Sequence, residues 1–184
     1  MRAYAFLGAA LKPYQAAVVA ALRARGHDIE PLETGDLARV AEIAGAAPAL
    51  LFLCGLPYTH LRDAGLPVEP LAAPVSAGTG DAAPCYRSVL VARADLAGAE
   101  LDDLQGLRLA INHRESMSGW VLPVGMGLPL ERFDEIVTTG AHRASLDAVL
   151  AGAVDAAPID SHVLAAEATG QPELLALPVL AEYG

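Results

Sequence analysis

The sequence predicts an α/β fold in which parallel-rich sheets are flanked by helices and divided between two small lobes. Apolar runs of strand length alternate with stretches of helical period along most of the chain. Hydrophobic residues make up 54% of the sequence and charged residues 18%, which suits a packed core and excludes a disordered chain. A Pro/Gly-rich interval at 55–84 separates two α/β series. We expect a first lobe at 1–84, with 178–184 returning to it, and a second lobe at 85–177.

Strands and helices alternate in the first series. Residues 4–7 and 49–53 are uninterrupted apolar runs, as expected of strands that are buried on both faces of a parallel sheet. Residues 14–25 have apolar side chains at helical spacing and are followed by Gly26, a typical helix end. A strand at 27–32 and a helix at 34–44 are predicted between them.

The Pro/Gly interval contains one candidate strand, and the second series then resumes the alternation. A helix is expected to begin near Ser116, and the prolines and glycines that follow it should interrupt that helix. A short helical turn is expected at 101–106, closed by its glycine. The remaining predicted elements are strands at 71–75, 86–92, 107–111, 135–138, 154–159 and 174–180, and helices at 143–151 and 160–168.

Composition and motifs exclude several classes of function. The formal net charge is −10 and no segment gathers Lys and Arg, which argues against nucleic-acid binding. Cys54 and Cys85 are expected to be free thiols, because they lack the Cys/His spacing of a zinc site. No phosphate-binding loop, nucleophile elbow or dinucleotide fingerprint is present. We therefore expect no catalytic residues, no metal and no cofactor.

No apolar run is long enough to cross a bilayer, and the N-terminus is not typical of an export leader. Residues 3–7 form a strand-like run directly after Met1 and Arg2, without a longer apolar core or a cleavage site. On this pattern alone, the chain is expected to be water-soluble and to lack a leader.

Ligands of parallel α/β sheets lie at the carboxyl ends of the strands, so the loops there are candidate sites. The segment from Asn112 to Gly119 follows one predicted strand and opens a helix, where backbone N–H groups are unpaired. Ser116 and Ser118 add hydroxyl donors, and Gly119 permits a close approach of the backbone. These features predict an anion site. Ser116 is equally well explained as an ordinary N-cap.

Two further strand ends contribute polar side chains. His142 follows the strand at 135–138 and is able to donate to an anionic group, or else to lie on the surface. Asp160 follows the strand at 154–159. Its spacing favours helix capping, while a carboxylate pointing toward a ligand is the alternative.

Consecutive blocks of the sequence resemble the phosphonate-type substrate-binding proteins of ABC transporters. The order of the blocks matches as well as their content. They lie at 52–58 (FLCGLPY), 71–75, 86–91, 104–106, 110–112, 116–120 (SMSGW), 140–146 (GAHRASL) and 154–161. The resemblance implies a periplasmic-binding-protein-like fold with a ligand cleft between its two lobes.

The resemblance also implies a set of ligand-binding residues. Ser116 and Ser118 match the serines that hold the anionic head group, whereas Met117 stands where phosphonate binders have a hydroxyl residue and so removes one donor. His142 matches a cleft histidine, and Asp160 lies near the place where an acidic group meets the far end of the ligand. The full candidate set is Tyr58, Tyr86, Ser116, Met117, Ser118, His142 and Asp160.

A transporter receptor for a small, phosphonate-like anion is the leading function that this resemblance implies, with an ABC permease as partner and a periplasmic location. Family members usually continue beyond the last strand and are usually exported, whereas this sequence is short at its C-terminus. A cytoplasmic ligand-binding or sensor protein is therefore an alternative, as is an enzyme that uses His142 or Asp160. A homodimer would cover apolar surface that a short first lobe leaves exposed.

Overall fold

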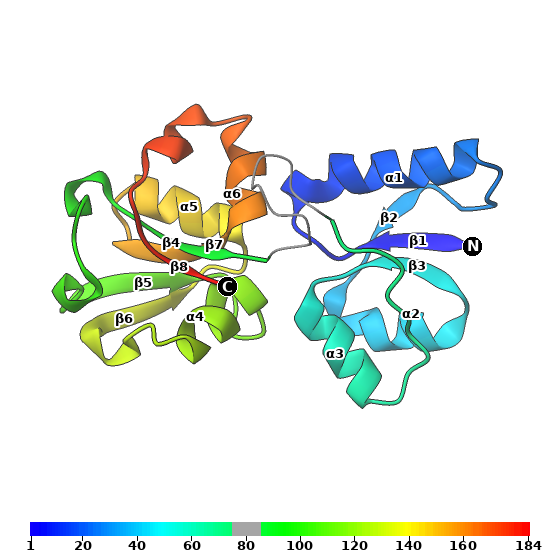
Figure 1. Cartoon of the computed structure of the whole chain (residues 1–184), viewed down its shortest axis with the longest axis horizontal. Coiled ribbons are helices and arrows are strands. Elements are labelled where there is room, and N and C mark those ends of the chain that lie inside the picture. Colours follow the sequence, from blue (N-terminus) through cyan, green and yellow to red (C-terminus); the bar gives the residue numbers. More distant parts are fainter. Residues whose placement is uncertain (75–85) are drawn as a thin grey trace. The chain divides into compact units, whose positions relative to one another are not determined.

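The computed structural model describes residues 1–74 and 86–184, which divide into two compact units, Met1–Ala72 and Ala73–Gly184 (Figure 1). Residues 71–74 are not a strand, and Val75, the end of the strand predicted there, lies outside the described residues. The lobe boundary predicted at 84/85 stays a prediction, because 75–85 is not described. No helix among the described residues is long and apolar enough to span a membrane.

The first unit is a three-stranded parallel sheet between helices. Its strand order is β2-β1-β3, and both pairings of β1 are parallel. Figure 1 shows α1 on one face of this sheet and α2 and α3 on the other. Ala3, Val19 and Ile29 form the core of the unit. The strands are β1 (Arg2–Ala5), β2 (Leu32–Thr34) and β3 (Ala49–Phe52), and the helices are α1 (Lys12–Ala24), α2 (Val40–Ala46) and α3 (Gly55–Asp63).

Two elements of the first unit differ from the sequence prediction. The second strand begins at Leu32 instead of 27, because Pro31 has no N–H to donate to a sheet ladder. The sequence pattern does not predict helix α3, whose residues lie in the Pro/Gly interval. Pro57 lies in the first turn of α3, where a proline costs no helical hydrogen bond, so here it is compatible with a helix.

The second unit contains a five-stranded mixed sheet of order β6-β5-β7-β4-β8. Strand β5 is parallel to β6 and β7, whereas β4 is antiparallel to β7 and β8. Along β4, Val89 and Val91 pack into one core cluster and Leu90 and Ala92 into another, so the strand is buried on both faces. The strands are β4 (Ser88–Ala92), β5 (Leu107–Ile111), β6 (Phe133–Thr138), β7 (Ala156–Asp160) and β8 (Val179–Tyr183).

Helices cover both faces of this second sheet. Leu146 and Val149 of α5 pack into the core cluster on one face, and Trp120 and Leu122 pack against the cluster on the other (Figure 1). The helices are η5 (Met117–Val121, a π-helical turn), α4 (Leu122–Gly125), α5 (His142–Leu150) and α6 (Ser161–Ala168). Short 3-10 helices lie at Ala9–Leu11, Leu37–Arg39, Ala94–Leu96, Leu101–Asp103, Leu130–Arg132 and Pro172–Ala176.

The end of the chain belongs to the second unit, so the expectation that 178–184 returns to the first lobe is wrong. Strand β8 pairs antiparallel with β4, with Tyr183 opposite Ser88 and Ala181 opposite Leu90. The Tyr183 side chain is buried in the core cluster that also contains Leu90. The apolar run at 174–180 begins as a 3-10 helix anchored by fully buried Leu174, and the strand starts only at Val179.

A buried carboxylate joins three segments of the second unit, and we predict that its removal destabilises the fold. Asp155 Oδ2 accepts from Arg108 N at 2.6 Å and from Arg108 Nε at 3.2 Å, and Asp155 Oδ1 lies 3.1 Å from Arg93 Nη1. Asp155→Ala should lower the free energy of unfolding by about 2–3 kcal/mol, somewhat below the cost of breaking a fully buried pair, because both guanidinium groups are partly solvated. Urea denaturation measures this loss.

The pH dependence of that loss follows from the Asp155 pKa. Burial raises this pKa, but the hydrogen bonds from Arg108 and the charges of Arg108 and Arg93 outweigh burial and leave it below its usual value. Stability from Asp155 is therefore present above its unfolded pKa and is lost as the pH falls through its folded pKa. Asp147→Ala is the control, because exposed Asp147 pairs with Arg143 one helical turn away. Equal losses in the two variants at neutral pH would contradict the prediction.

Candidate functional site

The carboxyl ends of β5 and β6 lie side by side and bring two predicted site loops together. The Thr139 amide donates to the Ile111 carbonyl at 2.8 Å, and the Gly140 amide donates to the Asn112 carbonyl at 2.9 Å. The loop after β5 leads into the turn at 116–119, and the loop after β6 leads into α5, whose first residue is His142. The parallel pairing of these strands thus positions the turn beside His142.

Ser116 caps the turn, as one of its two sequence interpretations predicted. Its Oγ accepts from the Gly119 amide at 3.0 Å, and its carbonyl accepts from the amides of Trp120 and Val121. The amides of Met117 and Ser118 donate no hydrogen bond within the described chain. The turn therefore has two backbone donors available, next to a serine that is already engaged as a cap.

Ser118 and His142, both predicted site residues, are in direct contact. Ser118 Oγ lies 2.9 Å from His142 Nε2, and the Ser118 side chain is almost fully buried. The Ser118 carbonyl accepts from Ser88 Oγ at 2.7 Å, which ties the turn to β4. Ser88 was not predicted as a site residue. It is fully buried, and its one sequence signal is a hydroxyl within an otherwise apolar strand.

His142 is a neutral hydrogen-bonding group at pH 7. Burial lowers its pKa from 6.5 to about 4; the negative charge of Asp160 opposes this effect, and His113 adds to it. Within the described chain, Nδ1 of the ring is buried and has no hydrogen-bond partner. His142 therefore contributes a dipole, and not a positive charge, to the site.

Asn112 completes this cluster although it was not among the predicted ligand residues. Its Nδ2 lies 3.4 Å from His142 Nε2, and the residue is 7% exposed. Its Oδ1 is buried and, among the described residues, has no partner. The carboxamide lies against Gly119, where a β-carbon would overlap Oδ1 and approach Asn112 Cγ to 2.9 Å. Glycine at 119 is thus required by the packing of Asn112.

Asp160 caps α6, as its spacing favoured. Its Oδ1 accepts from the His162 amide at 2.8 Å and from the Val163 amide at 3.3 Å, and it lies 3.4 Å from His162 Nδ1. The carboxylate also acts electrostatically on His142. Contact between Asp160 and a ligand stays a prediction.

The other candidates are less closely tied to this cluster. Met117 is half-buried in the turn and offers no side-chain hydroxyl. Tyr86 is half-buried just before β4. Tyr58 belongs to α3 in the first unit, where its hydroxyl accepts from Arg62 Nη1 at 3.0 Å. Ligand binding by these three residues stays a prediction.

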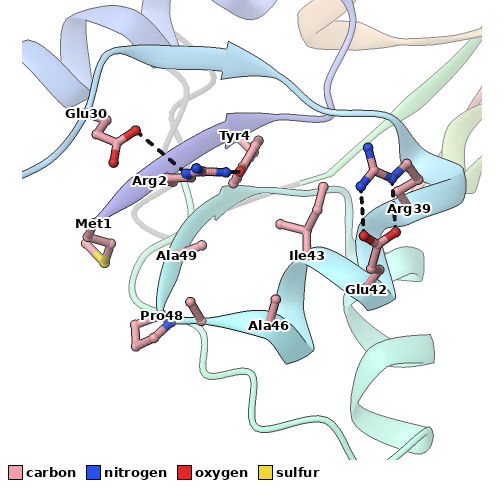
Figure 2. A pocket seen from close by; sticks show the side chains of 11 residues that line it. Met1, Arg2, Tyr4, Glu30, Arg39, Glu42, Ile43, Ala46, Pro48 and Ala49 are labelled. Carbon is pink, nitrogen blue, oxygen red and sulfur yellow. Dashed lines mark hydrogen bonds and ion pairs between the residues drawn. The ribbon is translucent and has the colours of Figure 1, made fainter.

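A pocket of about 420 Å³ lies in the first unit, at the amino ends of β1 and β3 (Figure 2). Its two arginines already pair with carboxylates, Arg2 with Glu30 at 3.7 Å and Arg39 with Glu42 at 2.7 Å. None of the predicted site residues lines it.

The described residues contain no group of three or more His, Cys, Asp and Glu side chains able to hold a metal ion. Cys54 is half-buried at the start of α3, and Cys85 lies outside the described residues.

Comparison with known proteins gives a family match and a common fold. The sequence profile of a family described as "ABC transporter, phosphonate, periplasmic substrate-binding protein" matches residues 44–182. No curated protein sequence matches the chain. The structure is similar to the binding protein component of an ABC phosphonate transporter from Pseudomonas aeruginosa, with 17% identity and a TM-score of 0.72. That match covers 100% of this chain and 64% of the Pseudomonas protein, so this chain spans less than two thirds of it.

Two further solved structures share the fold. PhnD1 from Prochlorococcus marinus, solved in complex with methylphosphonate, is 16% identical with a TM-score of 0.73, and the match covers 99% of this chain and 71% of PhnD1. A Xanthomonas citri protein bound to chloride ion is 15% identical with a TM-score of 0.69, covering 100% of this chain and 73% of that protein. These similarities confirm the predicted α/β fold with its parallel-rich sheets.

Proposed function

Because the chain belongs to the family of periplasmic substrate-binding proteins of phosphonate ABC transporters, we propose that it binds a small anion at the turn formed by residues 116–119. One observation carries this proposal. The buried Ser118 hydroxyl, in contact with neutral His142, lies in the turn whose Met117 and Ser118 amides donate no bond within the described chain. These groups offer hydrogen-bond donors, which an anion needs as acceptor.

The acidity of the chain does not oppose this proposal. Its net charge of −10 is spread over the sequence, and exposed charges are screened beyond about 10 Å at 0.1 M salt. Local donors therefore determine the affinity. Because His142 is neutral, the site binds through dipoles instead of an ion pair, and it should accept singly charged ligands as well as doubly charged ones.

Met117 narrows the expected ligand. In the resemblance described above, phosphonate binders have a hydroxyl residue at this position, and the thioether supplies no donor in its place. We therefore propose an anion with a small head group and leave phosphonate as one member of the class. A thermal-shift screen of phosphate, phosphonates, sulfonates and carboxylates identifies the ligand, since binding to the native state raises the melting temperature.

Ser118→Ala tests the site directly. Removal of the hydroxyl should weaken the binding of the best anion from that screen by about 1–3 kcal/mol, which is the cost of a lost hydrogen bond to a charged group. Isothermal titration calorimetry measures the change. Ser145→Ala is a matched control, because Ser145 is also fully buried but bonds Thr139 and the Ala141 carbonyl. Affinity that is unchanged in Ser118→Ala would refute the proposed site.

The family also suggests a partner and a place of action. We propose that the protein delivers its anion to an ABC permease at the outer face of a membrane, as a transport component without catalytic activity. Genes for a permease and an ATPase beside its own gene would support this role. Recovery of the bound anion in unaltered form after long incubation would separate transport binding from turnover.

A further inference from the structure

Two buried polar atoms of the site have no partner within the described chain, and both belong to the cluster around Ser118. They are His142 Nδ1 and Asn112 Oδ1. A buried polar atom without a hydrogen bond costs about 1–3 kcal/mol, so two of them in one cluster require an explanation. The position of the imidazole proton decides whether His142 Nδ1 is a buried donor or a buried acceptor, and the orientation of the Asn112 carboxamide decides which of its two polar atoms faces the ring.

The neutral His142 ring carries one proton, and its position decides what Ser118 offers to a ligand. With the proton on Nδ1, a buried N–H has no acceptor, and Ser118 must donate its hydroxyl hydrogen to Nε2. With the proton on Nε2, the ring donates to Ser118 Oγ across 2.9 Å, and the hydroxyl hydrogen stays available for an anion. The second tautomer satisfies the geometry better, because its one N–H has an acceptor and the unpartnered Nδ1 is a bare acceptor instead of a buried donor.

The orientation of the Asn112 carboxamide is linked to the tautomer of His142, because the carboxamide lies next to Nε2. A half turn of its carboxamide exchanges Oδ1 and Nδ2, which differ little in shape. Oδ1 then takes the position 3.4 Å from His142 Nε2, where it is a second acceptor for the Nε2 proton and no longer an unpartnered atom. Nδ2 moves to the buried position beside Gly119 that Oδ1 leaves, so the gain of this rotation is the contact between Oδ1 and the ring.

We propose that Asn112 is a positioning residue that favours the Nε2-protonated tautomer of His142 and thereby makes the Ser118 hydroxyl a donor to the bound anion. This inference rests on the proposed anion site. Asn112 is well placed for the role, since its carbonyl accepts from the Gly140 amide at 2.9 Å and its carboxamide packs against Gly119. Its carboxamide is therefore confined next to the imidazole.

The ionisable neighbours of His142 do not charge its ring at neutral pH, so the tautomer is what can change there. Asp160 and His113 are the titratable groups that act on the ring, and Asp160 is itself engaged as the cap of α6 beside His162. The pKa of about 4 keeps the ring uncharged at pH 7. At pH 7, a substitution at Asn112 should therefore change which ring nitrogen of His142 carries the proton, while the ring itself stays uncharged.

The first experiment determines the tautomer in the ligand-free protein. Protein labelled with 15N-histidine is observed at pH 7 by long-range 1H–15N correlation, which distinguishes a protonated ring nitrogen from a bare one. We expect the His142 signals to show a protonated Nε2 and a bare Nδ1. A protonated Nδ1 would overturn the inference, whatever the protein binds.

Two substitutions then test the role of Asn112. Asn112→Asp supplies an acceptor only, so the Nε2-protonated tautomer should persist while the pKa of His142 rises by at least about one unit. Asn112→Leu has a similar shape and no acceptor, so the two tautomers should mix and the dissociation constant for inorganic phosphate should rise about fivefold or more. Ser145→Ala should leave the ring signals unchanged, because Ser145 does not bond His142.

The outcomes separate this inference from the anion site. If Asn112→Asp and Asn112→Leu both fold and leave the His142 ring signals and pKa as in the wild type, Asn112 does not position the ring. If the ring responds as expected while Ser118→Ala binds phosphate as tightly as the wild type, the positioning role stands and the proposed anion site fails.

Discussion

Acidification from pH 7 to pH 4 should cost this protein about 3 kcal/mol of folding free energy through His142 alone. The pKa of His142 is about 4 in the folded chain because the ring is buried, whereas an unfolded histidine titrates near 6.5. The unfolded chain therefore binds a proton over a pH range in which the folded protein does not. At about 1.4 kcal/mol per pKa unit, this difference gives the expected loss.

The direction and the pH window follow from the two pKa values. This contribution is fully present above pH 6.5, falls as the pH is lowered from 6.5 to about 4, and has been lost below that point. Urea denaturation at a series of pH values measures it, with His142→Gln as the variant that cannot titrate. As the pH falls from 6.5 to about 4, the wild type should lose more free energy of unfolding than His142→Gln does.

A surface histidine controls for general acid effects. His27 is exposed, so His27→Gln should follow the wild-type pH profile. Parallel profiles for the wild type and His142→Gln between pH 6.5 and pH 4 would show that the His142 ring is already solvated, and this would contradict the burial on which the prediction depends.

Gly119→Ala should both destabilise the second unit and remove most of the anion affinity. The added methyl group would overlap Asn112 Oδ1, and it would lie 2.9 Å from Asn112 Cγ and 3.1 Å from the capping Ser116 Oγ. Asn112 must move, but it is buried against His142. Overpacking of this kind costs about 1–3 kcal/mol, and the displaced cap and carboxamide should weaken phosphate binding at least about tenfold.

Gly125→Ala is the matched control for this substitution. Gly125 ends α4 a short distance along the chain, and a β-carbon there meets no atom within 4 Å. Gly125→Ala should therefore be neutral or slightly stabilising, because alanine reduces the entropy of the unfolded chain. Thermal melts and phosphate titrations of both variants make the comparison. A Gly119→Ala protein that matches Gly125→Ala in both measurements would contradict the packing described for Asn112.

The contact between Ser118 and His142 could be predicted from the sequence, because the two residues follow neighbouring parallel strands. The strand predicted at 107–111 is β5 with the same bounds, and the strand predicted at 135–138 is the last part of β6. Parallel neighbours end at the same edge of a sheet, so the polar loops that follow them must meet. Family resemblance indicated the same residues independently.

Other parts of the site depend on packing that a residue pattern does not express. Ser116 could be assigned to a cap or to a ligand from its spacing, and the hydrogen bond to the Gly119 amide is what distinguishes the two. Asn112 differs from any polar residue at a strand end only through its buried, unpartnered oxygen. The pKa of His142 likewise depends on burial by distant segments.

The fold was harder to predict where tertiary pairing overrides local pattern. The residues of α3 include a glycine and a proline, which in sequence are typical of an irregular interval. Both residues also occur in the first turn of a helix, which is where α3 has them. The apolar run at 174–180 predicted one strand, but the burial of Leu174 in the core and the pairing of β8 with β4 divide it.

Because β8 pairs with β4, the sheet of the second unit depends on contacts between residues further apart in sequence than the sheet of the first unit does. In the first unit, β1 pairs with strands 29 and 47 residues further along the chain, since Ala3 lies opposite Leu32 and Leu50. In the second unit, β4 obtains one of its two partners only from Val179–Tyr183, and the other from β7. Such non-local closure is slow, and until it occurs β4 presents an open apolar edge on which other chains can pair. We therefore expect the sheet of the second unit, which contains the polar cluster, to form more slowly than the sheet of the first.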